Sequence, residues 1–174
     1  MKKIENKDLK RLSVEEFATT QKRPIILIAD NIRSSNNVGS LFRTADAFAI
    51  EQVWLCGITA TPPDREIHKT ALGAELSVMW RKFETTAEAI SELKSMGYTA
   101  IAIEQVEGAC SLEQFVPTSG GCGLILGNEV KGVDQDIVNM CDMAVEIPQW
   151  GTKHSLNVSV SAGIVLWQCV SSSL

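Results

Sequence analysis

The chain alternates between short runs of apolar residues and longer segments in which apolar residues recur every three or four positions. The first pattern is typical of strands covered on both faces, and the second of amphipathic helices. The apolar runs predict strands at 24–30, 52–57, 77–83, 98–104, 121–127 and 143–148. The periodic segments predict helices at about 38–48, 86–96 and 156–170, with a further short helix after Asp134.

Local signals mark several of these boundaries. Ser13 with Glu16, and Thr85 with Glu88, have the capping-box spacing that begins a helix, and Gly97 suits the position just after a helix end. The segment between residues 59 and 75 contains two prolines and no sustained period, which predicts a loop with a helical turn near 70–73. A loop of this length is more often functional than idle.

Strands that alternate with helices along a chain form a parallel sheet with helices on both faces. The sequence therefore predicts an α/β fold, a parallel-sheet α/β/α sandwich. Ligands of such folds bind in the crevice outside the carboxyl ends of the strands. Residues that directly follow strands are the first candidates for a functional site.

Size and composition indicate one domain. The 174 residues, 45% of them hydrophobic, suffice for a single core, and we expect a short basic leader with a helix at 1–23 and the main domain at 24–174. The five cysteines form no C-x-x-C motif and no close pairing with a histidine, which argues against a zinc site or a disulfide framework. Because no signal peptide or long apolar window occurs, we expect a cytoplasmic protein without a membrane span.

The charge is unevenly distributed. The net charge of −5 alone argues against a nucleic-acid partner, but residues 1–23 hold seven of the 16 basic side chains against four acids. A solubilising arm would explain that segment equally well. The other bases are concentrated in or beside predicted loops, where we expect Arg33, Arg65, Lys69, Lys131 and Lys153 to contact phosphates.

Uncommon polar residues gather in three segments at strand ends, 36–43, 126–134 and 147–163. Taken singly, their glycines suit turns, their acid suits a solvated loop, and their serines and asparagines suit helix caps. Parallel topology, however, places all three segments at one edge of the sheet. We therefore expect one crevice that contains Asn37, Arg43, Glu129, Ser155 and Asn157.

These segments, in this order, resemble the motifs of the SpoU family, also called TrmH-like, of RNA ribose 2′-O-methyltransferases in the SPOUT superfamily. The motif N-x-G-x-x-x-R corresponds to Asn37, Gly39 and Arg43, and the two further motifs correspond to 124–133 and 147–164. The resemblance implies a C-terminal trefoil knot, S-adenosylmethionine as methyl donor and no metal. It also implies tRNA or rRNA as substrate, with tRNA weakly preferred, and a homodimer whose active site takes residues from both subunits.

The resemblance also implies roles for individual residues. Arg43 would be the catalytic arginine and Asn37 its positioning partner, and Glu129, Ser155 and Asn157 would complete the polar cluster. The methyl donor would contact Ile103, Glu104, Leu126, Gly127, Ile147, Gln149 and Leu156. The position of Gln149 is often methionine in the family.

The implied reaction is an in-line displacement at a sulfonium methyl group by a ribose 2′-oxygen, which must lose its proton as the methyl group moves. A guanidinium has a pKa above ~12, so Arg43 suits phosphate binding and stabilisation of the developing alkoxide better than proton abstraction. The sequence leaves phosphate, Glu129 and water open as proton acceptors, and it leaves the target nucleotide open.

Two other functions stay open. The chain could be a catalytically weak, dimeric RNA-binding protein that keeps the fold. A doubly wound enzyme acting on a small molecule is a more distant alternative, because neither G-x-G-x-x-G after a strand nor a P-loop motif occurs in the sequence.

Overall fold

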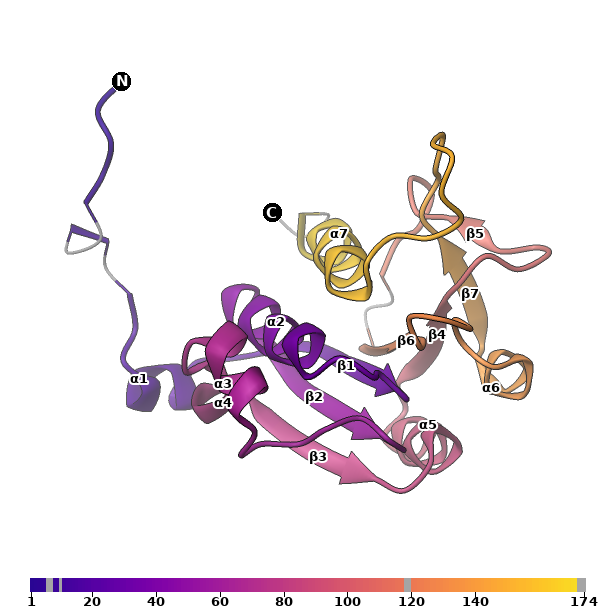
Figure 1. Cartoon of the computed structure of the whole chain (residues 1–174), viewed down its shortest axis with the longest axis horizontal. Coiled ribbons are helices and arrows are strands. Elements are labelled where there is room, and N and C mark those ends of the chain that lie inside the picture. The colour runs from indigo at the N-terminus through magenta and orange to yellow at the C-terminus, as the bar shows by residue number, and fades with distance from the viewer. Residues whose placement is uncertain (6–7, 10, 118–119, 172–174) are drawn as a thin grey trace.

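A seven-stranded parallel sheet forms the centre of the computed structural model, which describes residues 1–5, 8–9, 11–117 and 120–171 (Figure 1). The strands lie in the order β3-β2-β1-β6-β4-β7-β5. They are β1 (Arg23–Asp30), β2 (Ile50–Cys56), β3 (Met79–Phe83), β4 (Thr99–Ile103), β5 (Cys110–Ser111), β6 (Cys122–Leu126) and β7 (Met143–Glu146). The described helices are α1 (Val14–Thr19), α2 (Ser35–Ala47), α3 (Arg65–Ala71), α4 (Ala74–Ser77), α5 (Thr86–Ser95), α6 (Gln135–Met140) and α7 (Val158–Ser171).

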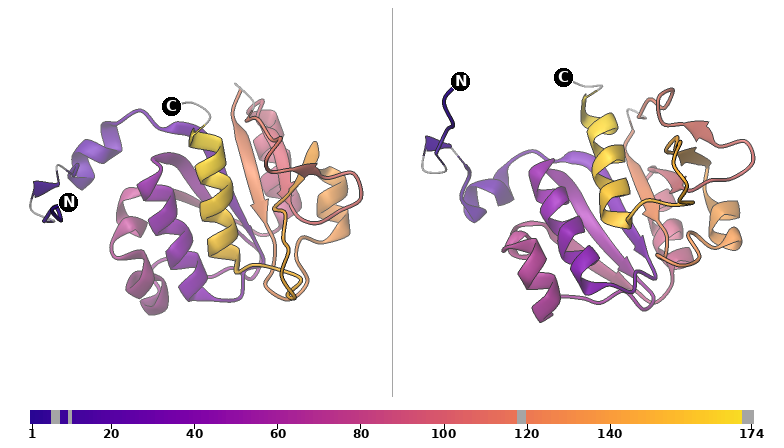
Figure 2. Two further views of the ribbon diagram at one scale, coloured as in Figure 1. Left: turned by 90° about the horizontal axis from the view of Figure 1, so that it is seen from above. Right: turned by 45° about the horizontal axis from the view of Figure 1, so that its top comes forward.

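Helices cover both faces of this sheet, as predicted. Helices α2 and α7 pack side by side on one face, with α3 and α4 beside α2 (Figure 2). The buried side chains of these helices join the larger apolar cluster, whereas those of α5 belong to a second cluster on the opposite face. Strand β6 is buried at every position, which explains its continuous apolar run.

The register of the sheet brings the carboxyl ends of its central strands to one level. Ala29 near the end of β1 lies opposite both Leu55 of β2 and Leu126 of β6. Ile103 at the end of β4 lies opposite Leu126 on one side and Val145 on the other. The loops that follow β1, β4, β6 and β7 therefore start at the same edge of the sheet.

Several predicted helix ends are confirmed. Ser13 and Glu16 form a reciprocal capping box at the start of α1. Thr85 accepts a hydrogen bond from the Glu88 amide at the start of α5, and Gly97 has a φ of 79° just beyond its end. The free thiols at all five cysteines agree with the expectation of no disulfide framework.

The prediction of a loop between residues 59 and 75 was wrong, because this segment contains α3 and the start of α4. Asp64 begins α3 by accepting hydrogen bonds from the amides of Glu66 and Ile67, at 2.8 and 2.9 Å. Ile67 and Ala71 are its buried residues. A helix of two turns is too short to display a helical period, and stability comes from packing against α2. The two-residue strand β5 was missed for the same reason of length.

Gly39 allows α3 to lie close to the first turns of α2. A Cβ atom at this position would lie 2.0 Å from Thr70 Oγ1 and 2.3 Å from the carbonyl oxygen of Ile67. The Thr70 hydroxyl also donates a 2.9 Å hydrogen bond to the carbonyl oxygen of Asn36. Glycine at this motif position is therefore explained by a close contact between two helices.

We expect Gly39→Ala to lower the free energy of unfolding by about 1–3 kcal/mol, because the added methyl group must push α3 away. Denaturant unfolding measures this change. The control is Asn36→Ala, an exposed position of the same helix, where a change within about 0.5 kcal/mol is expected. Equal unfolding midpoints for the two variants would contradict the packing explanation.

Candidate functional site

A cavity of about 490 Å³ lies at the carboxyl ends of β4, β6 and β7. We call it the first cavity. It is lined by residues of the loops after these three strands and by the start of α7. All seven residues predicted to contact a methyl donor line it, namely Ile103, Glu104, Leu126, Gly127, Ile147, Gln149 and Leu156. Its volume falls within the range of small-ligand sites, roughly 300–1,000 Å³.

The loop from residue 128 to residue 132, which we call the wall loop, is fixed on its first-cavity side by Glu104. This carboxylate accepts a 2.8 Å hydrogen bond from the Val133 amide and a 2.9 Å bond from the Gln105 amide. At Gly132, which has a φ of 71°, a Cβ atom would lie 2.1 Å from Glu104 Oε2. The tight approach of carboxylate and backbone therefore requires glycine here.

Gly127 is confined in the same way. A Cβ atom on Gly127 would lie 2.2 Å from both the Gly132 carbonyl carbon and the Val133 nitrogen. The wall loop thus doubles back directly against the end of β6. Asn128 stabilises this turn, because its side-chain oxygen accepts hydrogen bonds from the amides of Val130 and Lys131, at 2.8 and 3.3 Å. Asn128 lay inside the second motif, but sequence reasoning gave it no role.

Three polar side chains from distant parts of the chain join the loops around the first cavity. Asn37 donates a 2.8 Å hydrogen bond from Nδ2 to Glu129 Oε1, and its Oδ1 accepts a 3.1 Å bond from Asn157 Nδ2. We call Asn37, Glu129 and Asn157 the polar cluster. Glu129, Asn157 and Ser155 also line the first cavity, whereas Asn37 reaches it through these contacts.

The polar cluster also brings two helix N-termini together. Asn157 Oδ1 accepts hydrogen bonds from the amides of Ser159 and Val160 at the start of α7, at 2.9 and 3.4 Å. At the start of α2, the Glu129 carboxylate accepts bonds of 3.0 and 3.2 Å from the amides of Arg33 and Ser34. A negative charge at helix N-termini is favourable, so Glu129 stabilises this arrangement electrostatically.

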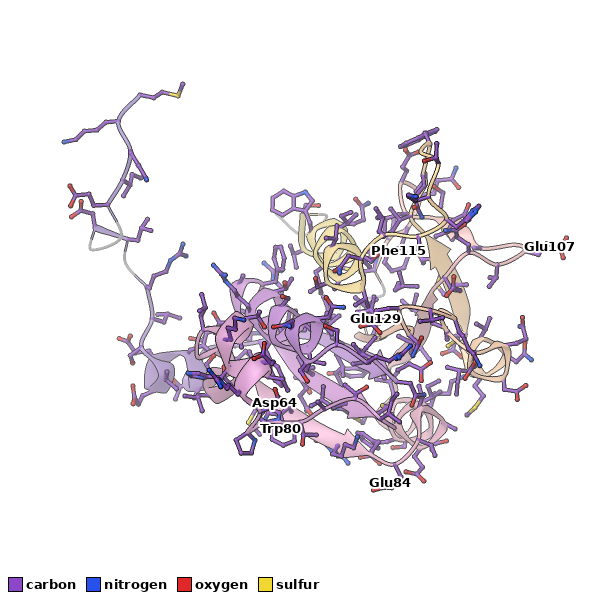
Figure 3. All side chains as sticks on the ribbon, viewed as in Figure 1. Asp64, Trp80, Glu84, Glu107, Phe115 and Glu129 are labelled. Atoms are coloured by element: carbon purple, nitrogen blue, oxygen red, sulfur yellow. The ribbon has the colours of Figure 1, made fainter. Side chains whose placement is uncertain are left out.

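The surroundings of Glu129 lower its pKa. Desolvation of the carboxylate acts to raise the pKa, but hydrogen bonds, first among them that from the Arg33 amide, outweigh it. A carboxylate with a lowered pKa that already accepts three hydrogen bonds is a weak proton acceptor near neutral pH. The geometry therefore favours a positioning role for Glu129. Figure 3 shows its side chain beside α7, whereas Glu107 projects from the loop between β4 and β5.

Arg43 does not line the first cavity. It is exposed on α2, six residues beyond Asn37, which corresponds to about 9 Å along the helix axis. The expectation that Arg43 shares one crevice with the polar cluster is therefore not met within a single chain. Six residues do not complete a whole number of helical turns, so the side chains of Asn37 and Arg43 leave α2 in different directions.

The five predicted phosphate contacts fall into two groups. Lys131 lines the first cavity, Arg33 begins the loop beside the polar cluster, and Lys153 is exposed on the segment before α7. Arg65 and Lys69 are exposed on α3 and do not line this cavity. Lys69 Nζ forms an ion pair with Glu66 Oε2 at 3.5 Å. Within the described ranges, no group of three His, Cys, Asp or Glu side chains is arranged to hold a metal ion.

Comparison with known proteins bears on these motifs. The SpoU rRNA Methylase family pattern matches residues 24–167. The chain belongs to this family. A 23S rRNA (guanosine-2′-O-)-methyltransferase, RlmB, of Neisseria meningitidis is 34% identical over 143 residues, which are 82% of this chain and 56% of that protein. The chain thus spans little more than half the length of this relative.

Two further comparisons agree with the family. A tRNA (guanosine(18)-2′-O)-methyltransferase of Aquifex aeolicus is 29% identical over 93% of this chain and 75% of its own length. The solved structure of an AdoMet-bound rRNA methyltransferase from Sinorhizobium meliloti superimposes with a TM-score of 0.82 at 24% identity, over 91% of this chain and 60% of that one. This structural likeness supports the parallel α/β fold.

We expect Glu129→Gln to be less stable than the parent chain at pH 7, by about 1 kcal/mol for an exposed carboxylate with several donors. A lowered folded-state pKa contributes stability above the unfolded value, and this contribution is lost as the pH falls through the folded value. The difference between the two chains should therefore shrink below the ordinary pKa of 4.5. Urea unfolding between about pH 3 and pH 7 measures it.

The control for this series is Glu107→Gln, which removes an exposed carboxylate away from the polar cluster. Its unfolding should follow the parent at every pH. If the free energy of unfolding of Glu129→Gln is lower than that of the parent by the same amount at every pH, the loss of the charge is not the cause.

Proposed function

We propose that the chain is an S-adenosylmethionine-dependent RNA methyltransferase that transfers a methyl group to a ribose 2′-hydroxyl of tRNA or rRNA. The observation that carries the proposal is that the second and third motif segments line the first cavity, while Asn37 of the first segment joins them through the polar cluster. The names of the rRNA and tRNA 2′-O-methyltransferases among its relatives support the same reaction.

The first cavity fits this methyl donor chemically. Ile103, Leu126, Ile147 and Leu156 offer apolar contacts for an adenine ring, and the tightly folded backbone at Gly127 offers amide and carbonyl groups. Glu104 and Gln149 are polar residues in the same lining. When bound, S-adenosylmethionine supplies a methyl group on a sulfonium, which needs no metal to be activated.

The chain must then position the ribose oxygen and stabilise the charge that develops on it. We assign the charge stabilisation to Arg43, which binds an RNA phosphate and faces the developing 2′-oxyanion. Because Glu129 is occupied by hydrogen bonds, we assign the proton to an RNA phosphate or to water. Positioning of this kind supplies roughly 7–11 kcal/mol of assistance in favourable cases.

A homodimer reconciles the position of Arg43 with this role. Val160, Ile164 and Trp167 form an apolar stripe on α7, with 49%, 38% and 57% of their surfaces exposed. A contiguous apolar stripe containing a tryptophan is typical of an interface between subunits. We propose that two copies pack through this stripe and that Arg43 of the partner subunit completes the site.

The proposal includes a trefoil knot at the carboxyl end. After β7, near one edge of the sheet, the chain returns past β4 and β6 to reach α7, which packs beside α2 (Figure 1). On this path the His154 carbonyl oxygen accepts a 2.8 Å hydrogen bond from Gln105 Nε2 in the loop after β4. This crossing of loops supports a knotted connection.

Calorimetric titration with S-adenosylmethionine, followed by methyl transfer to bulk tRNA and rRNA, tests the function. We expect saturable binding of the donor and transfer of its methyl group to RNA. Absence of donor binding would refute the proposal. Donor binding without transfer to either RNA would favour the alternative of an RNA-binding protein that keeps the fold.

We expect Arg43→Lys to lower turnover roughly a hundredfold, because lysine keeps the charge but loses the planar fork that binds phosphate and oxyanion together. The affinity for S-adenosylmethionine should stay unchanged, since Arg43 lies outside the first cavity. Arg81→Lys on the sheet edge at β3 is the matched control and should keep its turnover. A normal rate for Arg43→Lys would rule out a geometric role of the guanidinium.

We expect Trp167→Asp to separate the dimer into monomers, because it places a charge in the apolar stripe at its largest exposed side chain. Sedimentation velocity measures the assembly. Donor binding should persist and methyl transfer should be lost, since the cavity lies within one chain and Arg43 comes from the other. Leu76→Asp, an exposed apolar position on α4, should leave the dimer intact. A fully active monomer would overturn the shared site.

A further inference from the structure

A second cavity, of about 270 Å³, lies next to the first one. The wall loop separates them, because Asn128, Val130, Lys131 and Gly132 line both cavities. The other side of the second cavity is formed at the ends of β1 and β2, by residues that include Asp30 and Ile58. None of the sequence motifs assigns a role to this cavity.

Asp30 is the most unusual residue in this cavity. Only 1% of its surface is exposed, and its Oδ1 accepts hydrogen bonds from Thr86 Oγ1 at 2.5 Å and from Asn31 Nδ2 at 2.9 Å. The Asp30 carboxylate also lines the second cavity. A buried carboxylate is stabilised when its oxygens accept hydrogen bonds, so a donor group that enters the second cavity would find an acceptor in Asp30. Desolvation also raises the pKa of Asp30 above its ordinary value.

The second cavity has a rigid frame. Asn31 has a positive φ of 53°, which is uncommon for a residue with a side chain. Its side chain accepts a 3.2 Å bond from the Ile58 amide, and its carbonyl oxygen accepts a 2.8 Å bond from Asn128 Nδ2. Asn31 therefore connects the loops after β1, β2 and β6 through hydrogen bonds. Strained backbone that is held by several contacts is often found at functional sites.

The lining of the second cavity matches the parts of a nucleotide. Ile58 and Val130 are apolar side chains with 69% and 70% of their surfaces exposed, which suits contact with the face of a base. Arg33 and Lys131 supply positive charge for a phosphate, in a lining that also contains the acid Asp134. The acceptor at Asp30 suits an amino group on a base edge, in the way that acidic side chains accept from cytosine N4.

We propose that the second cavity binds one nucleotide of the RNA substrate beside the methylated one, and that Asp30 selects a base with an exocyclic amino group. Guanine, cytosine and adenine carry such a group, whereas uracil lacks one and has its single edge donor, the ring N3–H, between two carbonyl oxygens that the carboxylate repels. This inference rests on the proposed function, because the wall loop places the second cavity next to the first cavity, which we assign to the methyl donor. It adds a specificity determinant that the three motifs do not contain.

Binding of the four nucleoside 5′-monophosphates GMP, CMP, AMP and UMP to the full chain tests this inference. S-adenosylmethionine is present in excess to occupy the first cavity, and amide chemical shifts locate each nucleotide. We expect shifts around residues 30–33, 57–58 and 128–134. The amino-bearing nucleotides should bind roughly tenfold more tightly than UMP, since a hydrogen bond to a charged group is lost with uracil.

Asp30→Asn should abolish this preference, because an amide accepts from an amino group and donates to a carbonyl group equally well. Ile58→Ala does not disturb the buried carboxylate, and it should weaken binding of all four nucleotides. Leu76→Ala removes a similarly exposed aliphatic side chain outside the cavity and should change nothing. Equal affinities for the four nucleotides, or shifts confined to other surfaces, would overturn the proposal. An unchanged preference in Asp30→Asn would overturn it as well.

The two proposals fail separately in these measurements. Donor binding and methyl transfer by the unaltered chain decide the proposed function. The location and base preference of mononucleotide binding decide the role of the second cavity, because amide shifts identify the occupied cavity whether or not the donor is bound. Active methyl transfer combined with indiscriminate nucleotide binding would remove only the second proposal.

Discussion

The hydrogen bonds that the Asn37 side chain makes with Glu129 and Asn157 hold the functional edge of this molecule together. They connect segments that are 92 and 120 residues apart in sequence. Each partner has a second task, because Glu129 accepts from the backbone before α2 and Asn157 caps α7. A change at any one of the three therefore disturbs two helix starts and the border of the first cavity at once.

The same geometry separates binding from chemistry. The parallel register brings the ends of β4, β6 and β7 to one level, so a single chain can build the first cavity. The guanidinium of Arg43 lies further along α2 and outside that cavity. Under the proposed function, a single chain binds the methyl donor and a second copy supplies the arginine for transfer. The exposed apolar stripe around Trp167 offers the surface through which that copy could pack.

The sequence predicted the parts of this structure that depend on long or regular patterns. Buried strands have continuous apolar runs, and parallel topology then places the residues that follow them at one edge, which is why every predicted donor contact lines the first cavity. Helices α3 and α4 were not predicted, because helices of two turns or fewer are too short to display a helical period. The sequence did not predict that Arg43 lies outside the cavity, because motif spacing carries no information on side-chain direction. The sequence predicted no role for Asp30, because the role that we propose depends on contacts with Thr86 and Asn31 that exist only in the folded chain.

The local field at this edge differs from the net charge, which allows the RNA binding that we propose for an acidic chain. The chain carries a net charge of −5. At the edge, however, Arg33 and Lys131 lie beside the cavities, and the N-termini of α2 and α7 converge there. Helix N-termini contribute partial positive charge, and Glu129 neutralises only part of it. Electrostatic attraction of phosphate falls off within roughly 8–10 Å at physiological salt, so nearby cations outweigh distant acids. The wall loop, fixed by Glu104 on one side and by Asn31 on the other, carries Lys131, which lines both cavities.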